Sequence, residues 1–326
     1  MRAPEFWRRD GLMPALLAPL GCAYAAAGEL RRRAATPQRL PVPVVCIGNL
    51  VAGGAGKTPV AISVVGRLRA MGIDAHILSR GYGGRLAGPL RVDPARHHYT
   101  DVGDEALLLA RAAPTWVARD RRAGGRAAVA AGAGAIVLDD GHQNPHLVKN
   151  LSMVVVDGGY GFGNGRVLPA GPLREPVGRG LSRAGAVVVL GEGDAPAGLE
   201  GCGVPVLRAA LRPGPDAAAL AGRPVVAFAG IGRPEKFFQT LVALGADLRA
   251  TFAFADHHPY RAGDLAPALA AAQQEGASIV TTEKDAVRLP RGVAERVATL
   301  AISVCWQDMS ALDGLLSRLM AGREGG

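Results

Sequence analysis

Three kinds of residue are scarce in this 326-residue chain, and each scarcity excludes a class of protein. The four cysteines, at positions 22, 46, 202 and 305, show no paired spacing, which excludes a disulfide scaffold and a cysteine-based zinc site. Aromatic residues make up 5% of the chain, and no RNP-like motif, zinc-finger spacing or helix-turn-helix signature accompanies them. We therefore expect no nucleic-acid partner. Charged residues make up 20% against 49% hydrophobic residues, which excludes a disordered chain.

Lysine is also scarce, although the chain is strongly basic. Only four of the 37 basic residues are lysines, and the formal net charge is +9. The arginines that make up the rest carry planar guanidinium groups, which bind phosphate and carboxylate through paired hydrogen bonds. Such a surface fits nucleic acid, an anionic membrane or a phosphorylated substrate, and the charge alone does not choose among them.

Apolar runs and helical spacing alternate along the chain, and its length favours two domains. Strands are expected at 41–47, 73–78, 115–118, 135–138, 153–156 and 186–190, with helices at 59–70, 104–112 and 127–133. After a stretch rich in Gly and Pro (191–222), strands are expected at 224–229, 248–254 and 278–281, and helices at 234–244, 262–272 and 310–320. This alternation predicts an α/β fold, a mostly parallel sheet with helices on both faces, followed by a second, smaller α/β domain.

The N-terminal segment is apolar and flanked by arginines. No residue from 11 to 28 is charged, a length that just reaches what a transmembrane helix needs. Pro14 and Pro19 weaken the spanning interpretation, and both flanks are basic, so the positive-inside rule gives no orientation. We favour a helix at residues 1–30 that lies in an anionic membrane surface, with a buried helix, a spanning helix and a signal peptide as alternatives.

A glycine-rich turn between a predicted strand and a predicted helix carries the clearest motif. Residues 48–59 read GNLVAGGAGKTP, which matches the phosphate-loop pattern except that Val51 replaces its first glycine. Backbone N–H groups of such a turn hold phosphate oxygens, the lysine reaches the β- and γ-phosphates, and the threonine hydroxyl binds Mg²⁺. The expected nucleotide-binding residues are Val51, Ala52, Gly53, Gly54, Ala55, Gly56, Lys57 and Thr58.

An acidic pair follows another predicted strand. Asp139 and Asp140 stand at the carboxyl end of the apolar run in AIVLDDGHQNP, where carboxylates of a doubly wound sheet face the phosphate loop. We expect them to hold Mg²⁺ together with Thr58. The nearest segment to a guanine-specificity motif, TEKD at 282–285, has its Lys and Asp adjacent and fails the pattern, so ATP is the expected nucleotide.

Nine blocks of sequence resemble the tetraacyldisaccharide 4′-kinase family, the lipid A 4′-kinases of Gram-negative bacteria. In order along the chain they are GNLVAGGAGKTP (48–59), LSRGYGG (78–84), VGDEALLLA (102–110), VARDR (117–121), LDDGHQNP (138–145), PAGPLREP (169–176), AGIGRPEKFF (229–238), FADHHPY (254–260) and TTEKDA (281–286). The match runs over nearly the whole chain, and the shared order of the blocks makes the resemblance specific.

The resemblance implies an enzyme that uses ATP and Mg²⁺ to phosphorylate the 4′-hydroxyl of a tetraacylated glucosamine disaccharide 1-phosphate. It also implies a peripheral, monotopic location on the cytoplasmic face of the inner membrane, and two α/β/α domains joined by a short β linker. The expected division is a membrane helix at 1–30, a P-loop kinase core at 31–200, a linker at 201–222 and a smaller domain at 223–326. The candidate linker strands are 204–211 and 297–305.

The matching blocks also contain the expected catalytic and substrate-binding residues. By spacing alone, Asp104 is a helix N-cap, but the resemblance implies a catalytic aspartate there. It also implies a catalytic histidine at His257, with the neighbouring His258 as the alternative, and Lys57 is the third expected catalytic residue. A carboxylate or histidine is needed to take the proton of the acceptor hydroxyl. We expect the pair to meet when the two domains close. The candidate substrate-binding residues are Arg80, Arg119, Arg121, Arg174 and Glu175.

Two other functions remain open at the level of the residues. One is a different P-loop enzyme, such as a soluble small-molecule kinase or a synthetase that activates a carboxylate. The other is an ATPase that acts as a regulatory or nucleic-acid-binding switch and uses its basic surface. His142, after the acidic pair, is either a support for the metal site or a buried histidine with satisfied hydrogen bonds.

Overall fold

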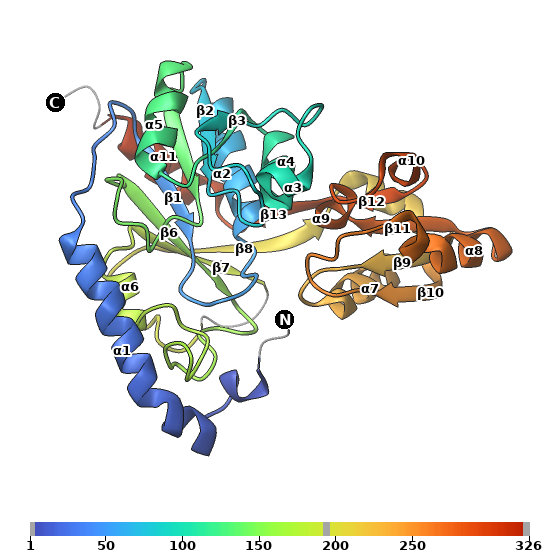
Figure 1. Ribbon diagram of the computed structural model, residues 1–326, viewed down its shortest axis with the longest axis horizontal. Helices are drawn as coiled ribbons and strands as arrows, with labels where there is room; N and C mark the ends of the chain where they lie inside the picture. The colour runs from blue at the N-terminus through green and yellow to red at the C-terminus, as the bar shows by residue number, and fades with distance from the viewer. Residues whose placement is uncertain (1–3, 192–195, 322–326) are drawn as a thin grey trace.

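The computed structural model describes residues 4–191 and 196–321, and its strands form a larger and a smaller sheet (Figure 1). The larger sheet has nine strands in the order β13-β8-β7-β6-β1-β5-β2-β4-β3. In chain order these are β1 (Val44–Gly48), β2 (Ala75–Ser79), β3 (Leu90–Arg91), β4 (Thr115–Val117), β5 (Ala135–Asp139), β6 (Leu151–Asp157), β7 (Ala186–Leu190), β8 (Val206–Pro213) and β13 (Ile302–Trp306).

Helices cover both faces of this sheet because its central strands alternate their side chains between two cores. Val45 and Ile47 of β1 pack with α2 (Lys57–Ala70) and α11 (Met309–Ala321), while Val44 and Cys46 pack with α5 (Arg121–Ala130). The strands pair in parallel except at the two edges, where β3 and β13 run antiparallel to their neighbours. The predicted α/β fold is confirmed. The remaining helices of this part are α3 (Tyr99–Val102), α4 (Asp104–Ala110) and α6 (Val177–Leu181).

The smaller sheet has four parallel strands in the order β10-β9-β11-β12. The strands are β9 (Pro224–Ala229), β10 (Asp247–Ala253), β11 (Ser278–Thr282) and β12 (Ala298–Leu300), and the helices are α7 (Pro234–Ala243), α8 (Ala266–Gln274), α9 (Glu283–Ala286) and α10 (Arg291–Ala294). One core lies between the sheet and α7, and a second lies between the sheet and α8. Three short 3₁₀ helices complete the fold at Glu5–Trp7, Pro215–Leu220 and Ala262–Leu265.

The two sheets are joined by a two-stranded ribbon. The first residues of β8 pair with β7, and residues 209–213 run on to pair with β13 beyond the end of β7. The expected strand at 297–305 is instead two strands, because its first part (β12) joins the smaller sheet and its last part (β13) joins the larger one. The C-terminal helix α11 was expected to belong to the smaller domain, at residues 223–326. It packs on the larger domain instead, because its Leu312 and Leu316 are buried in the core of the larger sheet.

The N-terminal helix α1 (Leu12–Ala34) lies along the outside of the larger domain (Figure 1). It is long and apolar enough, by length and composition, to cross a membrane, yet only 11% of its most apolar window is buried. Leu12, Leu16, Leu20 and Tyr24, which follow one another at i, i+4 spacing, are all exposed. The helix is attached at Gly21, where an added Cβ would lie 2.8 Å from the carbonyl oxygen of Val167. The buried-helix alternative therefore does not hold.

Candidate active site

The loop between β1 and α2 forms a cradle of backbone N–H groups. Gly53 and Gly56 adopt positive φ angles of 116° and 78°, which favour glycine, and an added Cβ at Gly53 or Gly54 would meet no atom within 4 Å. Within the described residues, no protein acceptor takes the N–H groups of residues 53–58. Free N–H groups at the start of a helix attract anions. The loop is therefore built to bind phosphate oxygens.

A second segment fixes this loop from outside. Ala52 donates its backbone N–H to the carbonyl oxygen of Pro172 at 2.7 Å, and Val51 forms a β-bridge with Leu173. Val51, the departure from the phosphate-loop pattern, is thus buried against the segment 169–176. At the other end, an added Cβ on Gly56 would lie 2.5 Å from Leu190 Cδ1. The loop is held at both ends by packing.

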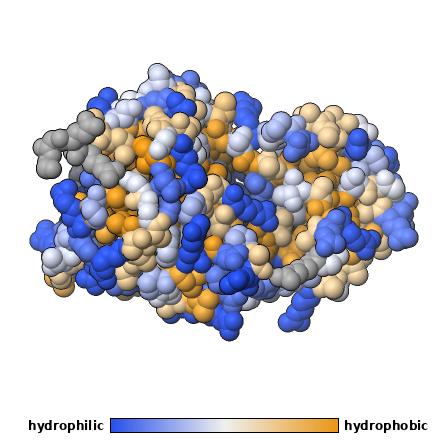
Figure 2. Space-filling model, turned by 90° about the horizontal axis from the view of Figure 1, so that it is seen from above, coloured by the Kyte–Doolittle hydropathy of each residue, from blue (hydrophilic) through white to orange (hydrophobic). Residues whose placement is uncertain are grey.

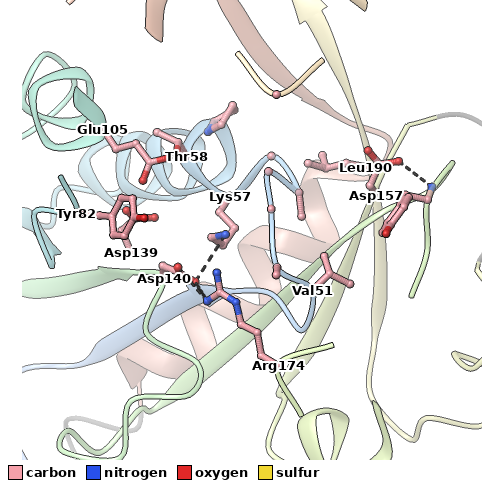
Figure 3. Close-up of a pocket in the computed structure, with 18 of the residues that line it drawn as sticks. Val51, Lys57, Thr58, Tyr82, Glu105, Asp139, Asp140, Asp157, Arg174 and Leu190 are labelled. Carbon is pink, nitrogen blue, oxygen red and sulfur yellow. Dashed lines mark hydrogen bonds and ion pairs between the residues drawn. The ribbon is translucent and has the colours of Figure 1, made fainter. Parts of the chain in front are cut away.

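The acidic pair lies beside the loop because β5 is the parallel neighbour of β1, with Asp139 in register with Ile47. Lys57 Nζ lies 3.6 Å from Asp140 Oδ1, and Arg174 Nη1 donates to the same carboxylate at 2.9 Å (Figure 3). Asp139 is buried; its Oδ2 accepts from the Ser79 hydroxyl at 3.5 Å, and its Oδ1 has no partner among the described residues.

The two carboxyl groups of this pair have opposite pKa shifts. Burial, together with the charges of Glu105 and Asp140, raises the pKa of Asp139 to about 7. Burial also acts to raise the pKa of Asp140, but the nearby Lys57 and Arg174 outweigh it, and the net shift is downward. At neutral pH, Asp140 is ionised and Asp139 is close to its midpoint.

The unpartnered oxygen of Asp139 fits a magnesium ion. Mg²⁺ is usually held by one or two carboxylates together with substrate phosphates and waters. Asp139, Asp140 and the hydroxyl of Thr58 supply such a set beside the phosphate loop (Figure 3). No cluster of three or more His, Cys, Asp or Glu side chains suited to a metal occurs in the described part of the chain.

Asp104 and His257 are in contact across the two domains. His257 Nδ1 lies 2.8 Å from Asp104 Oδ2, although the residues are 153 positions apart. The N-cap of α4 is Gly103, and Asp104 Oδ1 accepts from the N–H of Glu105 at 2.9 Å. Burial acts to raise the pKa of Asp104, but the hydrogen bond from His257 and the charges of Lys284 and Arg288 lower it. The expected approach of the two side chains is present in this structure.

The four candidate arginines have different surroundings. Arg80 and Arg119 are exposed and line the cleft, whereas Arg174 is bound to Asp140. Arg121 differs from the expectation: it is 3% exposed and donates to the carbonyl oxygens of Ala118 and Asp139 at 3.0 and 3.3 Å. Burial lowers its pKa to about 10. Its hydrogen bonds fix the ends of two strands, so in this structure it positions Asp139.

Glu175 and His142 also make specific contacts. Glu175 is bound by Arg183 at 2.7 Å and by Gln143 Nε2 at 3.0 Å, and the same amide group reaches the carbonyl oxygen of Asn49. His142 is a satisfied buried histidine: Nε2 donates to the Gly180 carbonyl oxygen at 3.0 Å and Nδ1 accepts from Ser152 at 2.7 Å. Burial lowers its pKa to about 4, which keeps the ring neutral.

Glu105 and Lys284, for which no sequence pattern predicted a role, also lie at the junction of the domains. Lys284 Nζ is 3.2 Å from Glu105 Oε1 and 3.4 Å from His257 Nε2. A second contact between the domains joins Arg233 to Asp157 at 2.5 Å, with Lys236 3.8 Å from the same carboxylate. Lys284 lies directly after the parallel strand β11, a position where side chains gather at one edge of a sheet, and this is the signal that could have found it; Glu105, within α4, has no such signal.

One cleft of about 2040 Å³ lies between the two domains, and it is lined by the phosphate loop, the acidic pair, Glu105, His257 and Lys284. Seen from above, the molecule has two lobes of unequal size, with hydrophilic residues where they meet (Figure 2). The cleft continues along the larger domain to Tyr24, Gly28 and Arg32 of α1. It is therefore large enough to take a nucleotide together with a second, elongated molecule.

Comparison with known proteins agrees with this geometry. The family model described as tetraacyldisaccharide-1-P 4′-kinase matches residues 13–321. Similar relatives include the tetraacyldisaccharide 4′-kinases of Rhodospirillum rubrum (56% identity, 99% of each chain) and Rhodospirillum centenum (56% identity, 99% of this chain and 98% of the relative). A similar solved structure is the "apo" form of LpxK from Aquifex aeolicus in complex with ATP, with 27% identity, a TM-score of 0.78, and coverage of 94% of this chain and 99% of that chain.

The matched model spans nearly the whole chain, including the phosphate loop, the acidic pair, and both members of the Asp104–His257 pair. The two relatives are matched over 99% and 98% of their own length as well. The chain belongs to the tetraacyldisaccharide 4′-kinase family.

Proposed function

We propose that this protein transfers the γ-phosphoryl group of ATP to the 4′-hydroxyl of a tetraacyldisaccharide 1-phosphate, giving the 4′-phosphorylated lipid A precursor. The observation that carries the proposal is the Asp104–His257 contact, because His257 lines the same cleft as the phosphate loop and the buried Asp104 lies directly behind its ring. A phosphate cradle alone is compatible with many enzymes, whereas a cradle facing a carboxylate–histidine pair fits transfer to a hydroxyl group.

The phosphate loop and Lys57 hold the nucleotide in this proposal. The N–H groups of residues 53–58 bind phosphate oxygens, and Lys57, freed from its 3.6 Å contact with Asp140, stabilises the charge that develops on the γ-phosphoryl group. Thr58, Asp139 and Asp140 would hold Mg²⁺. When bound, the ion neutralises phosphate charge and orients the triphosphate.

His257 takes the proton of the acceptor hydroxyl, and Asp104 orients the ring. Both oxygens of Asp104 already accept hydrogen bonds, and the residue is 5% exposed, whereas His257 lines the cleft and its Nε2 is the ring nitrogen that Asp104 does not occupy. As the proton passes to Nε2, the hydroxyl oxygen bonds to the γ-phosphorus. The bond from that phosphorus to the β–γ bridging oxygen breaks, and ADP leaves with the electron pair.

The acceptor side of the cleft is basic and leads to α1. Arg80 and Arg119 are exposed in the cleft and are candidates for the phosphate of the acceptor. The exposed apolar face of α1 suits insertion into one leaflet, with Arg31, Arg32 and Arg33 near anionic headgroups. We place the protein at the cytoplasmic face of the inner membrane as a peripheral, monotopic enzyme.

The direct test of the activity uses the purified protein, Mg-ATP and the tetraacyldisaccharide 1-phosphate. Mass spectrometry should detect a product heavier by one phosphate, with phosphorus at the 4′ position. Omission of either ATP or Mg²⁺ should abolish the product. ATP hydrolysis with no phosphorylated acceptor would contradict the proposal.

The membrane proposal is tested separately with anionic vesicles. Leu16→Gln combined with Leu20→Gln should release the protein from sedimenting vesicles and raise KM for the micellar acceptor more than KM for ATP. Val242→Gln is the matched control, because Val242 on α7 is as exposed as Leu20, at 59%. Vesicle binding equal to that of the unmodified protein in the double variant would remove α1 as the membrane contact.

A further inference from the structure

Lys284 stands out among the residues of the cleft because it contacts both domains and the catalytic pair. It extends from α9 of the smaller domain, and its Nζ lies 3.2 Å from Glu105 on α4 and 3.4 Å from His257 Nε2. Its side chain is 26% exposed and lines the same cleft as the phosphate loop. The Glu105 carboxylate in turn points toward Thr58, on the side where Asp139 lies (Figure 3).

A buried network fixes the position of Lys284. Its neighbour Asp285 is fully buried and accepts hydrogen bonds from Thr282, Tyr260 and the Gly230 backbone N–H. Arg288, 1% exposed, donates to Asp285 and to the carbonyl oxygens of Lys284 and Gly230. Networks in which each polar group is satisfied are rigid. The α9 turn is thus anchored to the loops that follow β9 and β10, including the loop that carries His257.

We propose that Lys284 is a further catalytic residue, whose ammonium group contacts the transferring phosphoryl group from the smaller domain. This inference rests on the proposed function. In the step described above, the hydroxyl proton moves to His257 Nε2 while negative charge spreads over the equatorial oxygens of the γ-phosphoryl group. Lys57 meets those oxygens from the loop side, and Lys284 meets them from the opposite side. Glu105 holds the ammonium group near His257 until the nucleotide competes for it.

The chemistry of the side chain supports this role. Lysine is a compact point charge on a flexible stem, which can move from a carboxylate to a phosphoryl group without a fixed planar geometry. It is also rare here, since only four positions in the chain carry it. If the ion pair of Lys284 with Glu105 served only to hold the two domains together, the contact of Lys284 with His257 would not be needed. Lys236, which also forms an ion pair across the domains, has its 3.8 Å contact with Asp157, away from the catalytic pair.

The test compares Lys284→Ala with Lys236→Ala in the full-length protein. Lys284→Ala should lower kcat by at least about a hundredfold, the usual cost of losing one group that stabilises transition-state charge. ATP affinity, measured by calorimetry, should change by less than about threefold, because the contact strengthens only in the transition state. Lys236→Ala should keep kcat within about twofold, as expected for a mostly exposed ion pair. Added ethylamine should restore turnover of Lys284→Ala and leave Lys236→Ala unchanged.

Exchanging the charges of Glu105 and Lys284 distinguishes a catalytic role of Lys284 from a role only in holding the two domains together. The double variant Glu105→Lys with Lys284→Glu can restore the ion pair between the domains but moves the cation to the other domain, so kcat should stay low. Recovery of unmodified turnover by the swap would overturn the proposal, as would a kcat within a few-fold of normal for Lys284→Ala. If thermal melting shows that Lys284→Ala does not fold, Lys284→Arg keeps the ion pair, and its kcat should still fall at least about fivefold.

The proposed function is judged independently in the same assay. Failure of the unmodified protein to phosphorylate the acceptor counts against the proposed activity. Normal turnover in the unmodified protein together with normal turnover in folded Lys284→Arg counts against the role of Lys284 alone.

Discussion

The two halves of the cleft are built in different ways. On the larger domain, the phosphate loop and its helix form one continuous segment, and the acidic pair lies on the next strand of the sheet. On the smaller domain, His257 and Lys284 come from separate segments after different strands, and they reach their partners only through contact between the domains. The first half is specified by local sequence, and the second by how the domains meet. The first half should therefore tolerate changes at the interface, while the second should not.

The largest effect is expected on the phosphate-loop side. Lys57→Ala should lower kcat by about a thousandfold or more, because the loop lysine stabilises charge on the transferring group without supporting the core. The circular dichroism spectrum of the variant should match that of the unmodified protein. Lys57 is the first residue of α2, and its side chain contacts Asp140 rather than the hydrophobic core, so its loss should not unfold the domain. Arg69→Ala, near the other end of the same helix, is the matched control and should retain normal turnover. Near-normal turnover of folded Lys57→Ala would remove the loop from the chemistry.

The next effect concerns the pair that joins the two halves. Asp104→Ala and His257→Ala should each lower kcat by about a hundredfold, with much smaller changes in both KM values. Residues that act as a unit are not additive, so the double variant should be little worse than the poorer single variant. His258→Ala is the control, because His258 contacts Asp264 within its own domain. Fully multiplicative losses would show that Asp104 and His257 act separately.

This contrast also explains what could be predicted from the sequence. The α/β fold, the phosphate loop and the position of Asp139 follow from short-range patterns, because strand ends and glycine turns leave local signatures. Pairing of Asp104 with His257 came from family resemblance, since no local pattern links residues 153 positions apart. Burial of Arg121 and the division of 297–305 between two sheets depend on tertiary packing, so neither has a local signal.

A smaller effect should appear in the pH dependence of magnesium binding. The pKa of Asp139 is raised to about 7, and a protonated carboxyl does not bind a metal ion, so affinity should fall as pH drops through 7. Between pH 8 and pH 6 the apparent affinity should fall by about tenfold, as measured by calorimetry with Mg²⁺ alone. Glu105→Gln removes a charge that raises this pKa, and the fall should move to lower pH. The same profile in both proteins would rule out coupling between Glu105 and Asp139.

The smallest effect is expected at the second contact between the halves. Arg233 lies 2.5 Å from Asp157, with side chains 40% and 17% exposed, and such partly exposed pairs contribute about 1 kcal/mol or less. If this pair favours the approach of the domains, Arg233→Gln should lower kcat by about two- to fivefold, the factor that corresponds to that energy.

Burial acts to raise the pKa of Asp157, but Arg233 holds it below its usual value, so the ion pair between Arg233 and Asp157 persists through neutral pH and is lost only in acid. Asp157→Asn should give at least the same loss, because it also removes the ion pair with Lys236, and the double variant should be no worse than Asp157→Asn alone. High salt should reduce the turnover of the unmodified protein toward that of Arg233→Gln and leave the variant nearly unaffected. Equal salt dependence in both proteins would mean that the domains meet through the Asp104–His257 side of the cleft without help from this pair.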